Sequence, residues 1–348
     1  MSQPAVTEPA NRMPVAVISG FLGSGKTTLI NHLVKQPGME ATALIVNEFG
    51  EIGLDHVLVD SAIENTLLLE SGCICCSIRG DLVDTIIDLF SKAELDQIPK
   101  FDRIMIETTG LADPAPIVQS IESEFALKNR CQLDSVVTVL DGRQGVAQLK
   151  QQDEAVMQVA QADIVLVSKS DLPDADVEGV SLAAKAINPV AEIRPIAYGD
   201  VEPDALFGRE QRLVRALAGD HDDHHQHDHD HDHDHEHEHH HDHDDDVRHG
   251  NVSTWSVSSK TPLDEAKLRD WLTMLYTLRP ANMLRLKGLI GLEGRDAPVL
   301  LQAVGPSFSP PVQLDAWPDG EATSRLVLIF KDLPADAVAA SFQRHVLP

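Results

Sequence analysis

Aromatic residues and long apolar runs are both scarce in this sequence. Aromatic side chains make up only 4% of the 348 residues, whereas hydrophobic residues make up 43%, which is typical of an aliphatic α/β core. No apolar run approaches the roughly 20 residues that a membrane helix needs. The polar, proline-containing residues 1–14 lack the basic and apolar regions of a signal peptide. We therefore expect a cytoplasmic protein without a membrane partner.

Basic residues and cysteines are also few. The chain has 28 Lys and Arg but 55 Asp and Glu, which gives a formal net charge of −27. Nucleic acids and anionic membranes bind basic faces, so this balance argues against both as partners. The chain has four cysteines, and the reducing cytosol does not favour a disulfide framework. Three of them are clustered at 73–76, which in that compartment indicates metal or redox chemistry.

Short β-branched runs alternate with helical patterns as far as residue 219. The runs are continuously apolar, as in strands that are buried on both faces. The predicted strands are 15–19, 42–47, 103–107, 135–141, 164–168 and 191–197, with a possible extra pair at 57–60 and 66–70. The predicted helices are 27–35, 82–92, 115–125, 153–161, 176–187 and 203–217. This alternation predicts an α/β domain with a doubly wound, mostly parallel sheet.

A histidine-rich segment interrupts this pattern at residues 220–249. Thirteen His alternate with Asp or Glu between His221 and His243. Such a composition cannot bury a core, so we expect a disordered linker. Order resumes near Val252. We expect strands at 252–258, 283–292, 298–304 and 325–330, a helix that Thr261 caps, and a terminal helix from Ala335, which together form a smaller α+β domain.

The segment from Gly20 to Thr27 has the pattern GxxxxGK[ST] between a predicted strand and a predicted helix. In that context the pattern predicts a P-loop whose backbone N–H groups surround phosphates. Lys26 would reach the β- and γ-phosphates, and the Thr27 hydroxyl would bind Mg²⁺. The predicted phosphate-binding residues are Gly20, Gly23, Ser24, Gly25, Lys26, Thr27 and Thr28.

Two later segments complete a predicted nucleotide site. Glu107 ends an apolar strand, which suits an acid that binds Mg²⁺ directly or through water, and the Gly110 N–H suits the γ-phosphate. Ser168, Lys169 and Asp171 form a variant of the guanine-reading pattern [NST]KxD. Asp171 would accept hydrogen bonds from the guanine ring N–H and exocyclic amine, Lys169 would cover the base with its stem, and Ser168 would lose a contact that Asn makes. We expect GTP to be preferred.

The segment Cys73-Ile-Cys75-Cys76 offers thiolates, the soft ligands that Zn²⁺ favours. A redox pair or inert cysteines would be the alternatives. Three thiolates leave a tetrahedral shell incomplete, which suits a carrier that must pass its metal on. Glu48, Glu51 or Asp55 could complete it.

Together these segments resemble the CobW-like GTPases. The shared features are GFLGSGKTT, NEFGEIGLD, GCICC, IETTG and SKSD in this order, with RLKGLI at 285–290 in the second domain. The resemblance implies a P-loop GTPase domain at 14–219, after a flexible N-terminus at 1–13, and a CobW C-terminal-like domain at 250–348. It also implies GTP hydrolysis with Mg²⁺, coupled to delivery of a metal from the cysteine site to a client metalloprotein. Zn²⁺ is expected, with Co²⁺ or Ni²⁺ insertion as the alternative within the family.

The histidine tract predicts additional, weaker metal binding. Neutral imidazoles bind several transition metals, and a flexible chain can bring three or four together. The expected ligands include His227, His229, His231, His233 and His235.

Two other functional classes for the whole chain are a passive metal buffer and a small-molecule kinase. The complete phosphate-binding set argues against the first, and the SKSD segment argues against the second. No residue stands out as the one that positions the attacking water.

Overall fold

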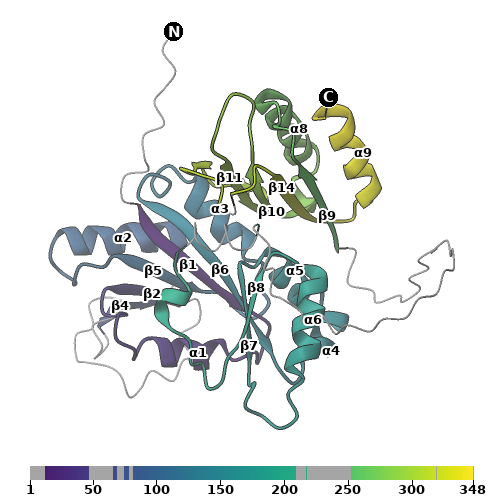
Figure 1. The fold of residues 1–348 in the computed structure, drawn as a ribbon. Coiled ribbons are helices and arrows are strands. Elements are labelled where there is room, and N and C mark those ends of the chain that lie inside the picture. The colour runs from purple at the N-terminus through teal and green to yellow at the C-terminus, as the bar shows by residue number, and fades with distance from the viewer. Residues whose placement is uncertain are drawn as a thin grey trace.

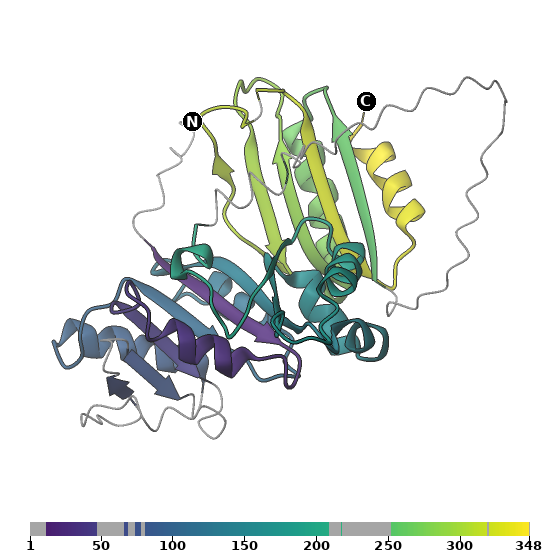
Figure 2. The same ribbon diagram turned by 60° about the horizontal axis from the view of Figure 1, so that its bottom comes forward.

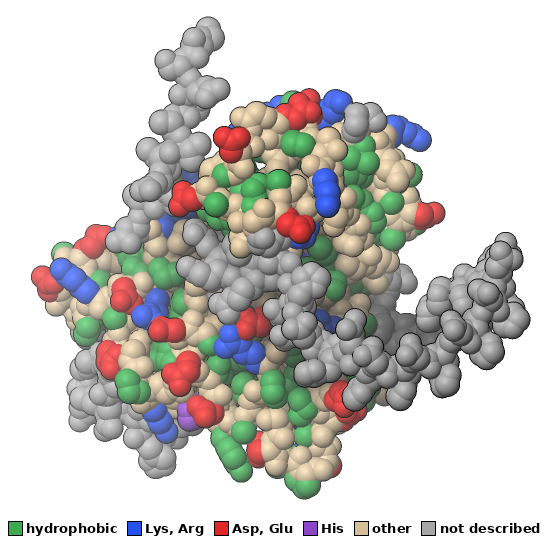
Figure 3. All heavy atoms as spheres, in the orientation of Figure 1, with side chains coloured by type: hydrophobic (Ala, Val, Ile, Leu, Met, Phe, Trp, Pro, Cys, Tyr) green, Lys and Arg blue, Asp and Glu red, His purple; other side chains and the backbone are tan. Residues whose placement is uncertain are grey.

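The computed structural model describes residues 12–46, 81–208, 217, 252–318 and 320–347, together with the backbone of 66–68 and 74–77. These residues form two sheets that lie one above the other, each with its own helices (Figures 1 and 2). No helix in the described ranges is long and apolar enough to cross a membrane. On the face drawn in Figure 3, acidic and basic side chains are interspersed rather than gathered into a patch of one sign.

The first sheet has eight strands in the order β3-β4-β2-β5-β1-β6-β7-β8, and all neighbours are parallel except β3 and β4. Its strands are β1 Met13–Gly20, β2 Thr42–Val46, β3 Thr66–Leu68, β4 Ile74–Ser77, β5 Arg103–Glu107, β6 Cys131–Asp141, β7 Ile164–Ser168 and β8 Glu192–Pro195. This confirms the doubly wound, mostly parallel sheet.

Helices cover both faces of this sheet because its central strands are apolar on both sides. They are α1 Lys26–Leu33, α2 Leu82–Glu94, α3 Ala115–Ser123, α4 Gly145–Gln151, α5 Asp153–Gln161 and α6 Val177–Ile187. On one face α1 packs against the sheet through Leu29 and Ile30, which contact side chains such as Ile18. On the other face α2 and α3 pack beside Val17, and α4, α5 and α6 pack around β6 and β7.

Several elements differ from their predicted bounds. The helix α4 was not predicted. Of the helix expected at 203–217, the described residues 203–208 form only the short 3₁₀ turn η1, Pro203–Ala205, and Gly208 takes φ 101°. Residues 209–216 lie outside the described residues. The strand expected at 66–70 is present at Thr66–Leu68, but its described partner is β4. Its expected partner at 57–60 lies outside the described residues.

The second sheet is antiparallel and belongs to the C-terminal domain. Its strands are β9 Val252–Ser259, β10 Met283–Ile290, β11 Val299–Val304, β12 Ser307–Phe308, β13 Val312–Gln313 and β14 Ser324–Lys331. The helices α8 Glu265–Leu278 and α9 Ala335–His345 pack on it through an apolar cluster that includes Trp271 and Phe342, and η2 Pro280–Asn282 follows α8. This confirms the smaller α+β domain.

The start of α8 corrects one prediction. Thr261 is not the cap: the Asp264 side chain accepts hydrogen bonds from the backbone N–H groups of Ala266 and Lys267, which also lowers the pKa of Asp264. The preceding Leu263 is held by Gly291, whose carbonyl oxygen accepts its N–H at 2.9 Å. This pairing keeps Leu263 extended, so the helix begins later than the sequence suggests.

The two domains meet through a buried ionic cluster. Asp163 lies between α5 and β7, and its carboxylate pairs with Arg285 and with Lys287 at 3.1 Å, both on β10. All three side chains are at most 6% exposed. The same carboxylate accepts the Val136 N–H at 3.0 Å, and Lys287 donates to the Val190 carbonyl at 3.1 Å. The cluster therefore joins the second sheet to the backbone of the first domain.

Candidate nucleotide site

The loop between β1 and α1 has the backbone of a phosphate-binding loop. Gly20, Gly23 and Gly25 have φ values of 142°, 72° and 100°, in the region that favours glycine. A Cβ at Gly20 would lie 2.4 Å from the Val139 carbonyl oxygen, so no larger residue fits there. The Ser24 hydroxyl is buried without a hydrogen-bond partner among the described residues. A glycine-lined loop with an unused hydroxyl fits a phosphate group.

Lys26 lies at the start of α1, and its side chain folds back onto this loop. Its Nζ donates to the carbonyl oxygens of Gly20 at 2.7 Å and Phe21 at 3.2 Å, and the residue is only 9% exposed. The ammonium group is therefore already directed to the concave side of the loop. That position suits contact with the oxygens of a bound phosphate chain.

Glu107 lies beside the loop because β5 and β1 are parallel neighbours in register. Ile18 is paired with Glu107, so the carboxyl ends of both strands meet at one edge of the sheet. Glu107 is 8% exposed there, and Thr27 is in the first turn of α1. A hydroxyl and a carboxylate are the hard oxygen ligands that Mg²⁺ prefers, so these residues fit that ion. When bound, Mg²⁺ neutralises phosphate charge.

Gly110 follows β5 and packs directly on the phosphate loop. A Cβ at this position would lie 2.6 Å from Leu22 Cδ2 and 2.9 Å from Leu22 N, so only glycine allows the approach. Helix α5 also holds this segment through hydrogen bonds. Gln158 Nε2 donates to the carbonyl oxygens of Gly110 at 3.2 Å and Ala112 at 3.1 Å. The chain after β5 is therefore fixed between the phosphate loop and α5.

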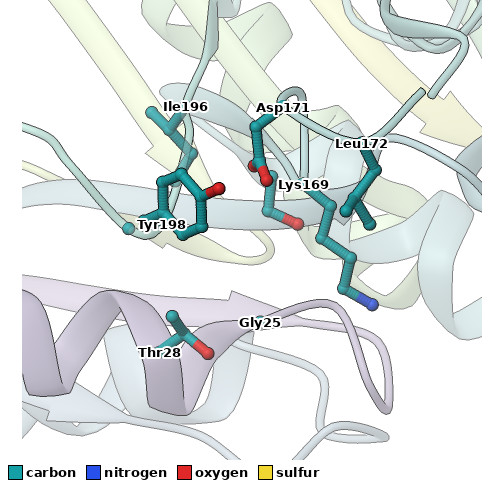
Figure 4. A pocket seen from close by; sticks show the side chains of 9 residues that line it. Gly25, Thr28, Lys169, Asp171, Leu172, Ile196 and Tyr198 are labelled. Atoms are coloured by element: carbon teal, nitrogen blue, oxygen red, sulfur yellow. The ribbon is translucent and has the colours of Figure 1, made fainter.

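A pocket opens beside the phosphate loop and collects the residues of the SKSD segment. Gly25 and Thr28 form its lower side, and Lys169, Asp171 and Tyr198 form its upper side (Figure 4). In that view the Asp171 carboxylate lies between Lys169 and Tyr198. Segments that are about 140 residues apart in sequence thus share one pocket next to the phosphate loop.

Ser168 and Lys169 connect this pocket to the phosphate loop. The Ser168 hydroxyl is 2.5 Å from the Ser24 carbonyl oxygen and 3.1 Å from that of Leu140. Lys169 has φ 55°, and its Nζ donates to the Gly23 carbonyl at 2.8 Å and to Asp141 at 2.5 Å. With its ammonium held at the loop, the aliphatic stem of Lys169 is left to line the pocket.

Two residues of this site were not predicted from the sequence. Asp141 ends β6 and is 3% exposed; besides Lys169 it accepts the backbone N–H of Arg143 at 2.8 Å. An acid at the end of a predicted apolar strand was the available signal. Tyr198 lies beyond the end of β8, where no motif marks it.

The predicted transition-metal ligands lie largely outside the described residues. Cys73 and the histidine tract are among those residues, as is the 47–55 segment. For Cys75 and Cys76 the backbone shows that they lie in strand β4 rather than in a loop, paired with Leu44 and Ile45 of β2. The described part of the chain contains no group of three or more His, Cys, Asp or Glu side chains that could hold a metal.

Comparison with known protein families agrees with this architecture. Residues 14–195 match the CobW/HypB/UreG nucleotide-binding domain, and residues 252–346 match the cobalamin synthesis protein CobW C-terminal domain. The chain belongs to the CobW family. The two matched regions correspond to the first and second sheets of the structure with their helices, and the P-loop, Glu107 and the SKSD segment all lie within the first.

Two relatives of this CobW-family chain are similar over almost their full length. The zinc chaperone YjiA of Escherichia coli is 29% identical over 95% of this chain and 98% of its own. The zinc chaperone CobW of Pseudomonas aeruginosa is 30% identical over 94% of this chain and 90% of its own. The crystal structure of Zn(II)-bound YjiA GTPase from E. coli superposes with a TM-score of 0.74, covering 96% of this chain and 99% of that one.

Proposed function

We propose that this chain is a GTP-hydrolysing metallochaperone that binds Zn²⁺ through Cys73, Cys75 and Cys76 and transfers it to a client metalloprotein. The observation that carries the GTPase part is the pocket in which Asp171 and Lys169 lie beside the phosphate loop. An acid that lines a base pocket accepts hydrogen bonds from N–H groups that guanine has and adenine lacks. Next to it, Lys26 would contact the phosphates, and Thr27 and Glu107 would bind Mg²⁺.

The zinc part is supported by the relatives and by the sheet. YjiA and CobW are named zinc chaperones and match this chain over nearly its full length. In the sheet, Ile45 of β2 pairs with Cys76 on one side and with Ile106, the neighbour of Glu107, on the other. Only one strand thus separates the strand of two cysteines from that of the Mg²⁺ acid. A structural change at the nucleotide would therefore have to cross only one strand to reach the proposed zinc ligands.

In this mechanism the nucleotide state sets how firmly the cysteines hold zinc. The segments 47–60 and 107–113 contact GTP and Mg²⁺ and draw the cysteines into a binding arrangement; after hydrolysis these contacts are lost and the metal is released. Cysteine must be deprotonated to bind, so zinc affinity falls as the pH is lowered. The histidine tract is a reservoir of weaker sites. The formal net charge of −27 argues against nucleic acid as a partner.

Replacing Asp171 with Asn tests the GTPase part. The Asn amide cannot accept from both guanine N–H groups, but it can donate to the 2-oxygen of xanthine. We expect kcat/KM for GTP to fall by about 10²-fold or more and kcat/KM for XTP to rise. Glu178→Gln, an exposed acid in the first turn of α6, is the matched control and should leave both values unchanged. Equal use of GTP and ATP by the wild-type protein would contradict the proposal.

A further inference from the structure

The turn after β8 presents an aromatic ring to the base pocket. Tyr198 is 74% exposed, so its ring is not part of the core. It lines the same pocket as Lys169 and Asp171. Figure 4 shows the ring on one side of the gap and the Lys169 stem on the other, with the Asp171 carboxylate between them.

The backbone that carries this ring is unusual. Tyr198 has φ 55°, a left-handed conformation that is strained for a non-glycine residue. The next residue, Gly199, has φ 80°, and a Cβ there would lie 2.9 Å from both Leu29 Cα and the Thr28 carbonyl oxygen. Close packing on α1, the helix that begins at the phosphate loop, therefore holds the turn and fixes the ring relative to that loop.

We propose that Tyr198 is the stacking wall of the base pocket. Its ring lies against one face of the purine, and the aliphatic stem of Lys169 lies against the other. The inference rests on the proposed GTP site and adds how the base is held there. Asp171 selects guanine by its edge, whereas Tyr198 contributes affinity for any purine because every purine has a flat π face. The two residues therefore have separable roles.

Nucleotide titrations of the full chain separate these roles. The ligands are GTP, ITP, which lacks the exocyclic amine, and ribose 5-triphosphate, which lacks the base. Tyr198→Ala should weaken GTP and ITP by the same factor, about 5- to 150-fold, and leave ribose 5-triphosphate unchanged. Tyr198→Phe should bind like the wild type because the ring is kept. In hydrolysis assays Tyr198→Ala should raise KM and leave kcat near the wild-type value.

Two further variants guard against a purely structural effect. Tyr198→Gly removes the ring at a position whose φ suits glycine, so it should fold well and still lose the same affinity. Phe125→Ala removes another exposed ring, 80% exposed, outside the pocket and should change nothing. Wild-type GTP affinity in both Tyr198→Ala and Tyr198→Gly, or an equal loss with ribose 5-triphosphate, would overturn the inference.

The outcome can be told apart from failure of the proposed function. If the wild-type protein binds ATP as tightly as GTP, guanine selection by Asp171 is wrong. Stacking on Tyr198 does not depend on the exocyclic groups, so its contribution would then be judged from the same ratios measured with ATP. An unchanged ATP affinity in Tyr198→Ala would overturn the stacking wall as well.

Discussion

Ser168 occupies the first position of the SKSD segment, and its hydroxyl donates to backbone carbonyl groups within the protein. It is 2.5 Å from the Ser24 carbonyl oxygen, so it joins the end of β7 to the phosphate loop. The neighbouring Lys169 does the same through Gly23. In the proposed function, Asp171 contacts the base edge. Besides its proposed role in guanine recognition, the segment therefore supports the phosphate loop.

Cys131 provides a prediction about thiol chemistry at the residue scale. It is fully buried, and burial raises the pKa of its thiol from 9.0 to about 12. We expect iodoacetamide at pH 8 to spare Cys131 in the native protein and to label it after unfolding in urea, as measured by mass spectrometry. Equal labelling rates in the two states would contradict this.

The same shift predicts a pH dependence of stability. The unfolded thiol ionises near pH 9 and the folded one near pH 12. The contribution of Cys131 to the free energy of unfolding is therefore fully present below pH 9 and is lost as the pH rises towards 12. Replacing Cys131 with Ala should remove this part of the alkaline loss of stability.

At the scale of single elements, α5 supports the chain after β5. Gln158 contacts the carbonyl groups of Gly110 and Ala112, and Gln161 Nε2 donates to Asp113 Oδ1 at 2.9 Å. Both glutamines are fully buried. Asp113 also accepts the Ala115 N–H at 2.9 Å, at the start of α3. One helix thus fixes the segment that we assign to γ-phosphate contact.

Gln158→Met keeps the length of the side chain and removes both hydrogen bonds. We expect a loss of about 1–3 kcal/mol in the free energy of unfolding, because the buried carbonyl of Gly110 and the half-buried carbonyl of Ala112 lose their donor. GTP hydrolysis should slow more than GTP binding weakens. Urea unfolding and single-turnover kinetics measure the two effects. Gln151→Met, at an exposed position on α4, is the control and should be neutral. A wild-type rate in Gln158→Met would show that this support is dispensable.

Local patterns predicted some elements with their bounds and missed others. Continuous apolar runs gave β5 and β7 as observed, and helical spacing gave α5. The helix α4 is only seven residues long, too short for a periodic pattern to stand out. The cap of α8 was misplaced because Leu263 is fixed by pairing with residues of the β10 end, which the local sequence does not contain. The phosphate loop and the SKSD segment could also be found locally, because each is a short motif of consecutive residues.

The rest of the site depends on contacts between distant parts of the chain. Tyr198 reaches the pocket through the packing of Gly199 on α1, about 170 residues earlier, and no motif records that. The Asp163 contacts with Arg285 and Lys287 cross the domains. RLKGLI was recognised as a family feature, but its sequence alone gave no partner for these two cations.

At the scale of the whole molecule, this ionic cluster fixes how the two domains sit. Arg285 also donates to the Ala303 carbonyl at 3.3 Å and to Gln302 at 3.2 Å, so its charge is bound on the C-terminal side as well. Apolar contacts surround the cluster: Leu284 and Ile329 of the second sheet pack among side chains of α5 and α6. The interface is therefore part of the folded core rather than a loose contact.

Asp163→Asn tests this interface. The variant leaves two buried cations without their carboxylate, and we expect a loss of about 3–5 kcal/mol in the free energy of unfolding. Asp174→Asn breaks an exposed pair with Arg143 and should cost about 1 kcal/mol or less. Calorimetric unfolding of both variants gives the comparison. Equal, small losses would mean that the cluster does not hold the domains together.

The central claim is that the nucleotide state controls zinc held by the cysteines. The most direct test is a zinc competition titration at fixed pH of the full chain, and of a variant without residues 221–249, with a non-hydrolysable GTP analogue or with GDP, each with Mg²⁺. We predict tighter binding with the GTP analogue by about 5- to 150-fold. The difference should vanish in a variant with Cys73, Cys75 and Cys76 replaced by Ala. The same zinc affinity in both nucleotide states would contradict the account.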